Sequence, residues 1–140
     1  MSRAFIVGIL IAFAAVSAAA QQPLEYKVTV TGEVARGSAA DHFLTFDGPF
    51  HIPEVTLPAG TYVFTVVAPS IIRVSSPDRS HQYAMFYATP TEQWEPGDQY
   101  EMVFARTDPA APLRIAKWFL PYQTAGFEFR YLQVETAGDR

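Results

Sequence analysis

Hydrophobic and polar residues alternate along most of the chain after residue 23, which is the period of a β-strand rather than of a helix. The clearest example is the segment 24–31, where Leu24, Tyr26, Val28 and Val30 alternate with charged or polar residues. This pattern predicts a strand with those four side chains on one buried face. Further short apolar or alternating runs follow at 42–46, 50–52, 55–57, 61–67, 71–75, 81–89, 100–104, 113–119 and 127–131.

Turn residues separate these runs at intervals of roughly 8–14 residues, a spacing typical of all-β domains. The segment Ser76–Ser80 contains Pro77 and Asp78, which suit the two central positions of a type I turn, so a hairpin is expected there. After the N-terminal segment, no stretch of the sequence has the period of an amphipathic helix. If 50–52 and 55–57 are taken as short extended pieces, about eight strands remain, and strands spaced in this way predict an antiparallel β-sandwich, with a small closed β-barrel as the alternative.

The N-terminal segment has the three parts of an export signal. Met1–Arg3 carries a positive charge, Ala4–Val16 is apolar, and Ser17–Ala20 is a run of small residues of the kind that signal peptidase cleaves. A membrane anchor is the alternative, but the apolar run is near the short limit for a bilayer span. The predicted organisation is therefore a signal peptide at 1–20, one β-domain at 21–133 and a frayed tail at 134–140, without a membrane span in the mature protein.

Composition narrows the location and the partners. The formal net charge is −4, and removal of residues 1–20 takes away Arg3 but no acidic residue, so the mature chain carries −5. Acidic chains are poor partners for nucleic acids, which demand basic patches. With no cysteine, disulfides, thiolate nucleophiles and a lipid-modified N-terminal cysteine are excluded. The scarcity of Lys relative to Arg suggests a bacterial source, and we expect a periplasmic or extracellular protein.

The three histidines are the side chains most able to indicate a metal centre, because imidazole is a common metal ligand. His42, His51 and His81 are spread over the chain, and no two have the i, i+2 spacing that places both on one face of a strand. We therefore treat these three as weak metal candidates and expect no metal or other cofactor. The serines and acidic residues form no recognisable hydrolase motif, so no catalytic residue is predicted.

Trp94 is the one candidate for contact with a ligand or a partner. It lies in a loop that also contains Gln93, Glu95, Pro96 and Gly97, and an exposed indole there could stack on a sugar or on another protein. The competing interpretation is that the side chain folds back over the core, and it is favoured because an exposed Trp is energetically costly.

Two segments carry a resemblance to known proteins. The run Val55–Phe64 has the sequence VTLPAGTYVF, and Lys117–Pro121, KWFLP, is followed by Gly126–Phe129, GFEF. In this order the segments resemble an uncharacterised family of small exported bacterial β-sandwich proteins, over about Phe43 to Tyr131. The chain departs from the family at Phe127, where members often have His. The resemblance implies a β-sandwich fold and assigns no catalytic residue.

Together these observations predict an exported, non-enzymatic binding or envelope-associated module whose partner is an unknown protein or small ligand. One alternative is a carrier with an apolar cavity for a small ligand. The other is a hydrolytic or metal-dependent enzyme. A loop-rimmed aromatic patch would favour the first, an enclosed pocket the second, and converging His and carboxylate side chains the third.

Overall fold

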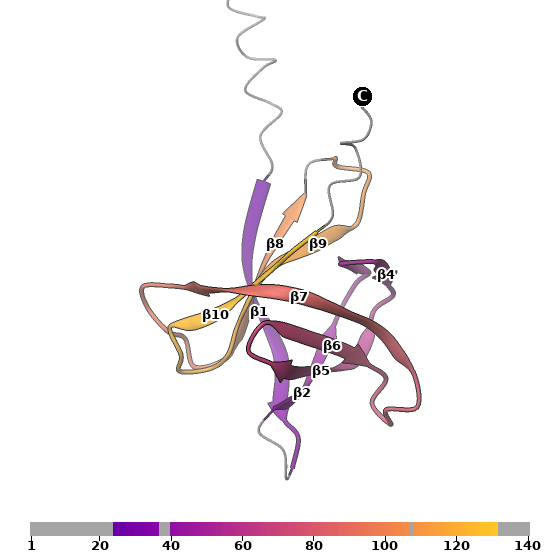
Figure 1. Ribbon diagram of the computed structural model, residues 1–140. Helices are drawn as coiled ribbons and strands as arrows, with labels where there is room; N and C mark the ends of the chain where they lie inside the picture. Colours follow the sequence, from indigo (N-terminus) through magenta and orange to yellow (C-terminus); the bar gives the residue numbers. More distant parts are fainter. Residues whose placement is uncertain (1–23, 37–39, 107, 132–140) are drawn as a thin grey trace, which may run out of the picture.

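The computed structural model describes residues 24–36, 40–106 and 108–131 (Figure 1). The predicted signal peptide at 1–20 and the predicted tail at 134–140 lie outside the described residues. All regular structure in the described residues is β. These residues contain no helix that is long and apolar enough to cross a membrane. The ten strands are β1 (Leu24–Val34), β2 (Asp41–Phe46), β3 (Phe50–Ile52), β4 (Val55–Leu57), β5 (Gly60–Ala68), β6 (Ile71–Ser75), β7 (Gln82–Glu92), β8 (Tyr100–Arg106), β9 (Leu113–Phe119) and β10 (Ala125–Phe129).

Eight of these strands form a closed β-barrel. Their order is β10-β7-β6-β5-β2-β1-β8-β9, and β10 also pairs with β9, which joins the two ends of the sheet. All the pairings around the barrel are antiparallel. The predicted all-β antiparallel class is confirmed, but the β-sandwich preferred from the sequence is wrong, and the alternative of a small closed barrel is correct.

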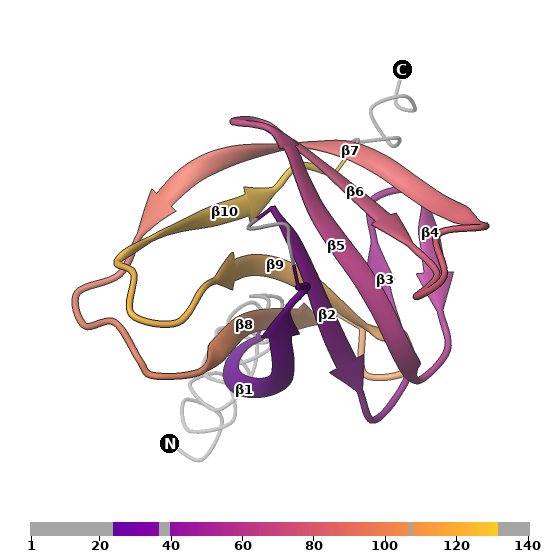
Figure 2. The ribbon, with the colours of Figure 1, turned by 90° about the horizontal axis from the view of Figure 1, so that it is seen from below.

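Two long strands account for the difference between a sandwich and a barrel (Figure 2). Both β1 and β7 have 11 residues. In β1, residues 24–30 pair with β8 and residues 31–34 pair with β2. In β7, residues 82–87 pair with β6 and residues 88–92 pair with β10. Each strand thus passes from one half of the sheet to the other, as at the corners of an orthogonal packing.

The remaining two strands form a hairpin against the end of the barrel. β3 lies parallel to β9 through Phe50 and His51, and β4 pairs with β3. Phe50, Ile52 and Leu57 are almost fully buried, so the hairpin supplies side chains to the same hydrophobic core as the barrel strands. The short apolar runs predicted at 50–52 and 55–57 are therefore strands, and their burial explains why they are apolar.

Aromatic side chains fill the interior of the barrel. Trp118 of β9 is fully buried, and its ring lies 5.3–5.5 Å, between ring centroids, from His42, Phe64 and Phe127. Close packing of this kind leaves little room for voids. The burial of His42, Leu44 and Phe46 places them on the inward face of β2. The centre of β5 is buried on both faces, because Val63 and Thr65 are buried as well as Tyr62 and Phe64.

The first half of β1 contradicts its predicted burial. Leu24, Tyr26 and Val28 have exposed fractions of 59%, 41% and 42%, and only Val30 is buried. Pairing of β1 with β2 begins at Thr31, so the segment before it is supported by β8 alone among the described strands. The alternation of apolar and polar residues correctly predicts a strand here. It does not indicate whether other residues cover the apolar face of that strand.

Gly126 of β10 is required where the barrel closes. It pairs with Phe119 of β9 and with Thr91 of β7. A Cβ atom at this position would lie 2.3 Å from the Phe119 ring and 2.6 Å from the Trp118 carbonyl oxygen. Both distances are shorter than van der Waals contact, so a side chain would push β10 away from β9.

The packing of β5 leads to a test of the core. Phe64→Ala should lower the free energy of unfolding by about 3–5 kcal/mol, because it removes a fully buried ring. Val67→Ala, an exposed position of the same strand, should change it by less than about 0.5 kcal/mol. Urea unfolding of both variants measures these values, and equal losses would contradict the assignment of Phe64 to the core.

Candidate functional site

The connection between β7 and β8 positions the candidate site. These strands are not neighbours, since β10 and β9 lie between them in the barrel. Residues 93–99 therefore cross the ends of β10 and β9. The crossing is held by two backbone hydrogen bonds to the β9–β10 turn: the Gln93 amide donates to the Thr124 carbonyl at 2.9 Å, and the Tyr122 amide donates to the Gly97 carbonyl at 2.7 Å.

Trp94 projects from this connection into solvent. Its exposed fraction is 97%, whereas Trp118 is fully buried. The interpretation favoured from the sequence, in which Trp94 folds back over the core, is therefore wrong. An indole left in water loses the stabilisation of burying about 150–250 Å² of aromatic surface, so its exposure calls for a functional explanation more than an exposed small residue would.

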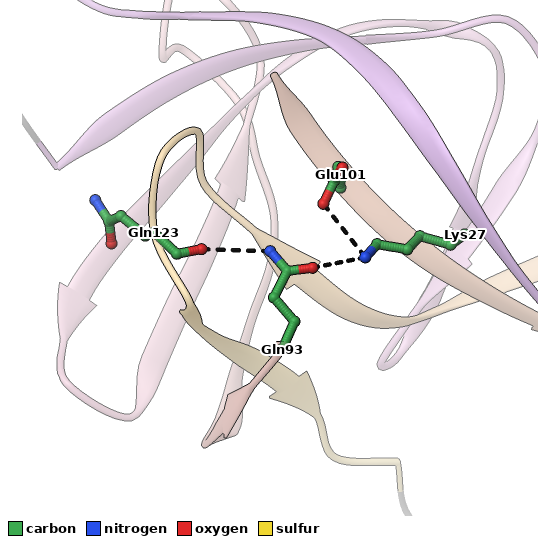
Figure 3. Close-up of polar contacts among 4 residues, drawn as sticks. All are labelled: Lys27, Gln93, Glu101 and Gln123. Carbon is green, nitrogen blue, oxygen red and sulfur yellow. Dashed lines mark hydrogen bonds and ion pairs between the residues drawn. The ribbon is translucent and has the colours of Figure 1, made fainter. Parts of the chain in front are cut away.

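Polar side chains from three parts of the chain meet at Gln93, the residue before Trp94, and Figure 3 shows Gln93 with Lys27 and Glu101. Lys27 Nζ of β1 donates a 2.7 Å hydrogen bond to Gln93 Oε1, and Gln93 Nε2 donates to the Gln123 carbonyl at 3.3 Å. The same ammonium lies 3.6 Å from Glu101 Oε1 of β8. Gln93 thus links the β7–β8 loop to β1 and to the β9–β10 turn, which fixes the base of the loop carrying Trp94.

Glu101 has unused capacity to accept hydrogen bonds. Its side chain is only 19% exposed, and among the described residues its buried Oε1 has no hydrogen-bond partner. Gly97 makes room for this carboxylate, because a Cβ atom at position 97 would lie 2.5 Å from Glu101 Oε2. A buried acceptor that is only loosely paired is costly, and the charged neighbour of this oxygen is the Lys27 ammonium at 3.6 Å. A ligand hydroxyl in the hollow would instead bond to the other carboxylate oxygen, Oε2.

These residues surround a hollow of about 490 Å³, lined by Lys27, Gln93, Trp94, Glu95, Pro96, Gly97 and Glu101. The volume is within the range of sites for small molecules, roughly 300–1,000 Å³. One side chain offers an aromatic face, and Lys27 and Glu101 offer a donor and an acceptor. The arrangement can therefore bind a ligand that has both a flat apolar face and hydroxyl groups.

Sequence reasoning identified Trp94 and its neighbour Gln93, but it missed Lys27 and Glu101 as partners. Lys27 and Gln93 are 66 residues apart in the chain. Lys27 opposes Val103, and Glu101 opposes Thr29, so the charged pair is diagonal across the β1–β8 ladder. The only sequence signal is that each occupies an outward position of its strand, a property that many surface residues share.

The three histidines occupy separate environments. His42 is buried in the barrel, where its Nδ1 lies 2.8 Å from the Tyr100 hydroxyl. His51 lies in β3, and its Nδ1 is 2.9 Å from Thr56 Oγ1. His81 is exposed beside the β6–β7 turn. Within the described ranges, no group of three or more His, Asp or Glu side chains is placed to hold a metal ion.

The predicted hairpin at Ser76–Ser80 is confirmed, and Asp78 organises it. Its Oδ1 accepts hydrogen bonds from the Ser76 hydroxyl and from the amide and hydroxyl of Ser80. These bonds favour the ionised carboxylate and lower the pKa of Asp78 to about 2. The nearby serines are thus used in a turn, which accounts for their clustering in the sequence.

Comparison of the chain with family models, curated proteins and solved structures finds no match. The family resemblance suggested by Val55–Phe64 and Lys117–Phe129 therefore stays a prediction. The class defined by the fold is a small closed antiparallel β-barrel, and the candidate site is the Trp94 hollow on its surface.

Burial of His42 leads to a test of pH dependence. Desolvation lowers the pKa of His42 below its ordinary 6.5, and Asp41 opposes the shift in part. The unfolded chain therefore takes up this proton first as the pH falls. Above about pH 6.5, neutral His42 makes its full contribution to the free energy of unfolding. This contribution is lost as the pH falls from there through the lowered pKa that His42 has in the folded protein.

We expect His42→Gln to reduce the difference in unfolding free energy between about pH 7.5 and pH 5. Urea unfolding at the two pH values measures this difference. An undiminished difference in the His42 variant would show that other groups cause the acid sensitivity.

Proposed function

We propose that the protein is an exported, non-enzymatic binding module, and that the Trp94 hollow holds a saccharide. The observation that carries the proposal is the almost complete exposure of Trp94 beside a hollow with charged donor and acceptor groups. An exposed aromatic ring on a loop beside the hollow supports a binding module over a carrier or an enzyme.

A saccharide matches both halves of the site. One face of a pyranose ring presents C–H groups, which carry partial positive charge and are attracted to the negative face of an aromatic ring. The rim of the sugar presents hydroxyl groups. The Lys27 ammonium has three donors and already uses one on Gln93, so it can donate to a sugar oxygen, and Glu101 can accept from a hydroxyl.

The base of the site is held by several hydrogen bonds, which favours binding. Gln93 is held by its backbone amide and by both ends of its side-chain amide. A residue fixed before the ligand arrives loses little conformational freedom on binding, so more of the contact energy appears as affinity. The filled interior of the barrel favours this surface site over an apolar-ligand carrier, since the core packs around Trp118.

Removal of the indole tests the proposed function. With a panel of soluble hexose and N-acetylhexosamine oligosaccharides, the wild-type protein should bind at least one member, and Trp94→Ala should weaken that binding roughly 30-fold or more. This is the loss that corresponds to truncating a binding hot spot worth about 2 kcal/mol. Isothermal titration calorimetry measures the affinity directly.

Two further variants separate the site from general surface effects. Tyr87→Ala removes an aromatic ring that is 69% exposed but does not line the hollow, so it should keep the affinity. Glu101→Gln, which removes a charged acceptor, should weaken binding. If no saccharide of the panel binds, or if Trp94→Ala binds as tightly as the wild-type protein, the proposed function is wrong.

Export is the second part of the proposal, supported by the sequence of residues 1–20. We expect signal peptidase to cleave after Ala20. Mass spectrometry of the protein recovered from the envelope or the medium should give a chain that begins at Gln21. A recovered product that still contains Ala4–Val16 would contradict cleavage.

A further inference from the structure

The first half of β1 has a free edge. Residues 24–30 pair with β8 on one side, and the pairing of β1 with β2 covers only residues 31–34. Among the described strands, none pairs with the other side of residues 24–30. Figure 1 shows this half of β1 rising beside β8 and away from β2. An uncovered edge offers backbone donors and acceptors for another strand.

Apolar surface accompanies the free edge. Leu24, Tyr26 and Val28 share one face of β1 and are all largely exposed. Beside them lies a cleft of about 240 Å³, whose lining includes Val28, Phe46, Phe50, Phe104 and Leu113. Strand edges are commonly protected by charged side chains, by proline or by bulges, and this edge carries the charged residues Glu25 and Lys27 on its other face. Inward-pointing charges or proline would protect the face toward the cleft as well. Here the face toward the cleft carries neither between Leu24 and Val30.

We propose that this edge pairs with the same edge of a second copy of the chain, forming an antiparallel β1–β1 ladder across a two-fold axis at Tyr26. The segment Leu24–Val28 reads Leu-Glu-Tyr-Lys-Val, which complements itself when reversed. With Tyr26 opposite Tyr26 of the second copy, Glu25 of each chain faces Lys27 of the other. Opposite charges directly across a ladder stabilise the pairing, and the two-fold axis produces the contact twice.

The charge pattern selects this register over its neighbours. A shift that centres the axis on Glu25 or on Lys27 places two like charges directly opposite each other, which is destabilising. A slip of one residue brings the charged face of one strand opposite the apolar face of the other. A parallel ladder in register places Glu25 against Glu25 and Lys27 against Lys27. The register centred on Tyr26 avoids all of these conflicts.

The same register also places an apolar residue at the cleft. Leu24 of the second copy lies opposite Val28, which lines the cleft and is 42% exposed, so its side chain can cover Val28. Pairing over residues 24–28 ends before Thr31, where β2 occupies the edge. The Lys27 ammonium lies on the β8 and β9 side of the strand, 3.6 Å from Glu101 Oε1 and 5.9 Å from the centre of the Phe119 ring. Its side chain must therefore turn across β1 and release Gln93 to meet Glu25 of the second copy.

Charge reversal gives a sharp test, with protein purified from cells that express the full chain. Sedimentation velocity over concentrations from about 1 µM to 1 mM covers the range expected of a small interface. The wild-type protein should form dimers. Glu25→Lys and Lys27→Glu should each raise the dimer dissociation constant at least about tenfold, because each places like charges opposite each other at both contacts.

Mixing the two variants should restore association. In the mixed dimer, the introduced lysine at position 25 faces the introduced glutamate at position 27, and the native Lys27 and Glu25 face each other as before. Native mass spectrometry should therefore detect mainly the mixed dimer. Circular dichroism of each variant alone confirms that it is folded, so that loss of dimer reports on the interface.

A cysteine cross-link tests the position of the axis. The chain has no cysteine, so Tyr26→Cys introduces a single thiol that should form a disulfide-linked dimer under mild oxidation, since directly opposed residues have the required separation. Val34→Cys, at another exposed position of β1, should cross-link at least about tenfold more slowly. A wild-type monomer at all concentrations, dimers indifferent to both charge reversals, or equal cross-linking at the two positions would each overturn the proposal. These measurements report the oligomeric state and not saccharide binding, so their outcome is independent of the proposed function.

Discussion

Closure of the sheet by β10 is the constraint on which the rest of the structure depends. This five-residue strand pairs on one side with β7 and on the other with β9, which turns an open sheet into a barrel. The seam is tight, because only glycine at position 126 avoids the Phe119 ring and the Trp118 backbone. It also brings Phe127 against Trp118, so the aromatic core and the closure of the barrel support each other.

The candidate site follows from the same closure. Because β10 and β9 separate β7 from β8, the β7–β8 connection must cross the ends of both strands, and the β9–β10 turn anchors it there. The crossing carries Trp94 outward and brings Gln93 to Lys27 of β1. In an open sheet the loop would lack these supports. The hydrogen-bonded base of the candidate site thus arises from the order of strands rather than from a local motif.

The barrel has a second consequence at β1. A strand that pairs with β8 along its first half and with β2 along its second leaves half of each edge open. At the open half beside the Phe46–Phe50 corner, apolar side chains are exposed without a covering layer. Exposed apolar surface beside unpaired backbone groups is unfavourable in an isolated chain, which makes this edge the natural place for a second strand.

The sequence by itself determined the local structure of this protein. Alternation located the strands, including β1 and β5, and Pro77 with Asp78 located the β6–β7 hairpin, because strand period and turn chemistry depend on residues close together in the chain. Tertiary structure alone decided three other properties: the barrel in place of a sandwich, the exposure of Leu24 and Trp94, and the meeting of Lys27 with Gln93 and Glu101. Each depends on which strands become neighbours. That choice is made by pairings such as Phe127 with Pro90 and Lys27 with Val103, which join residues far apart in the chain and leave no periodic signal in it.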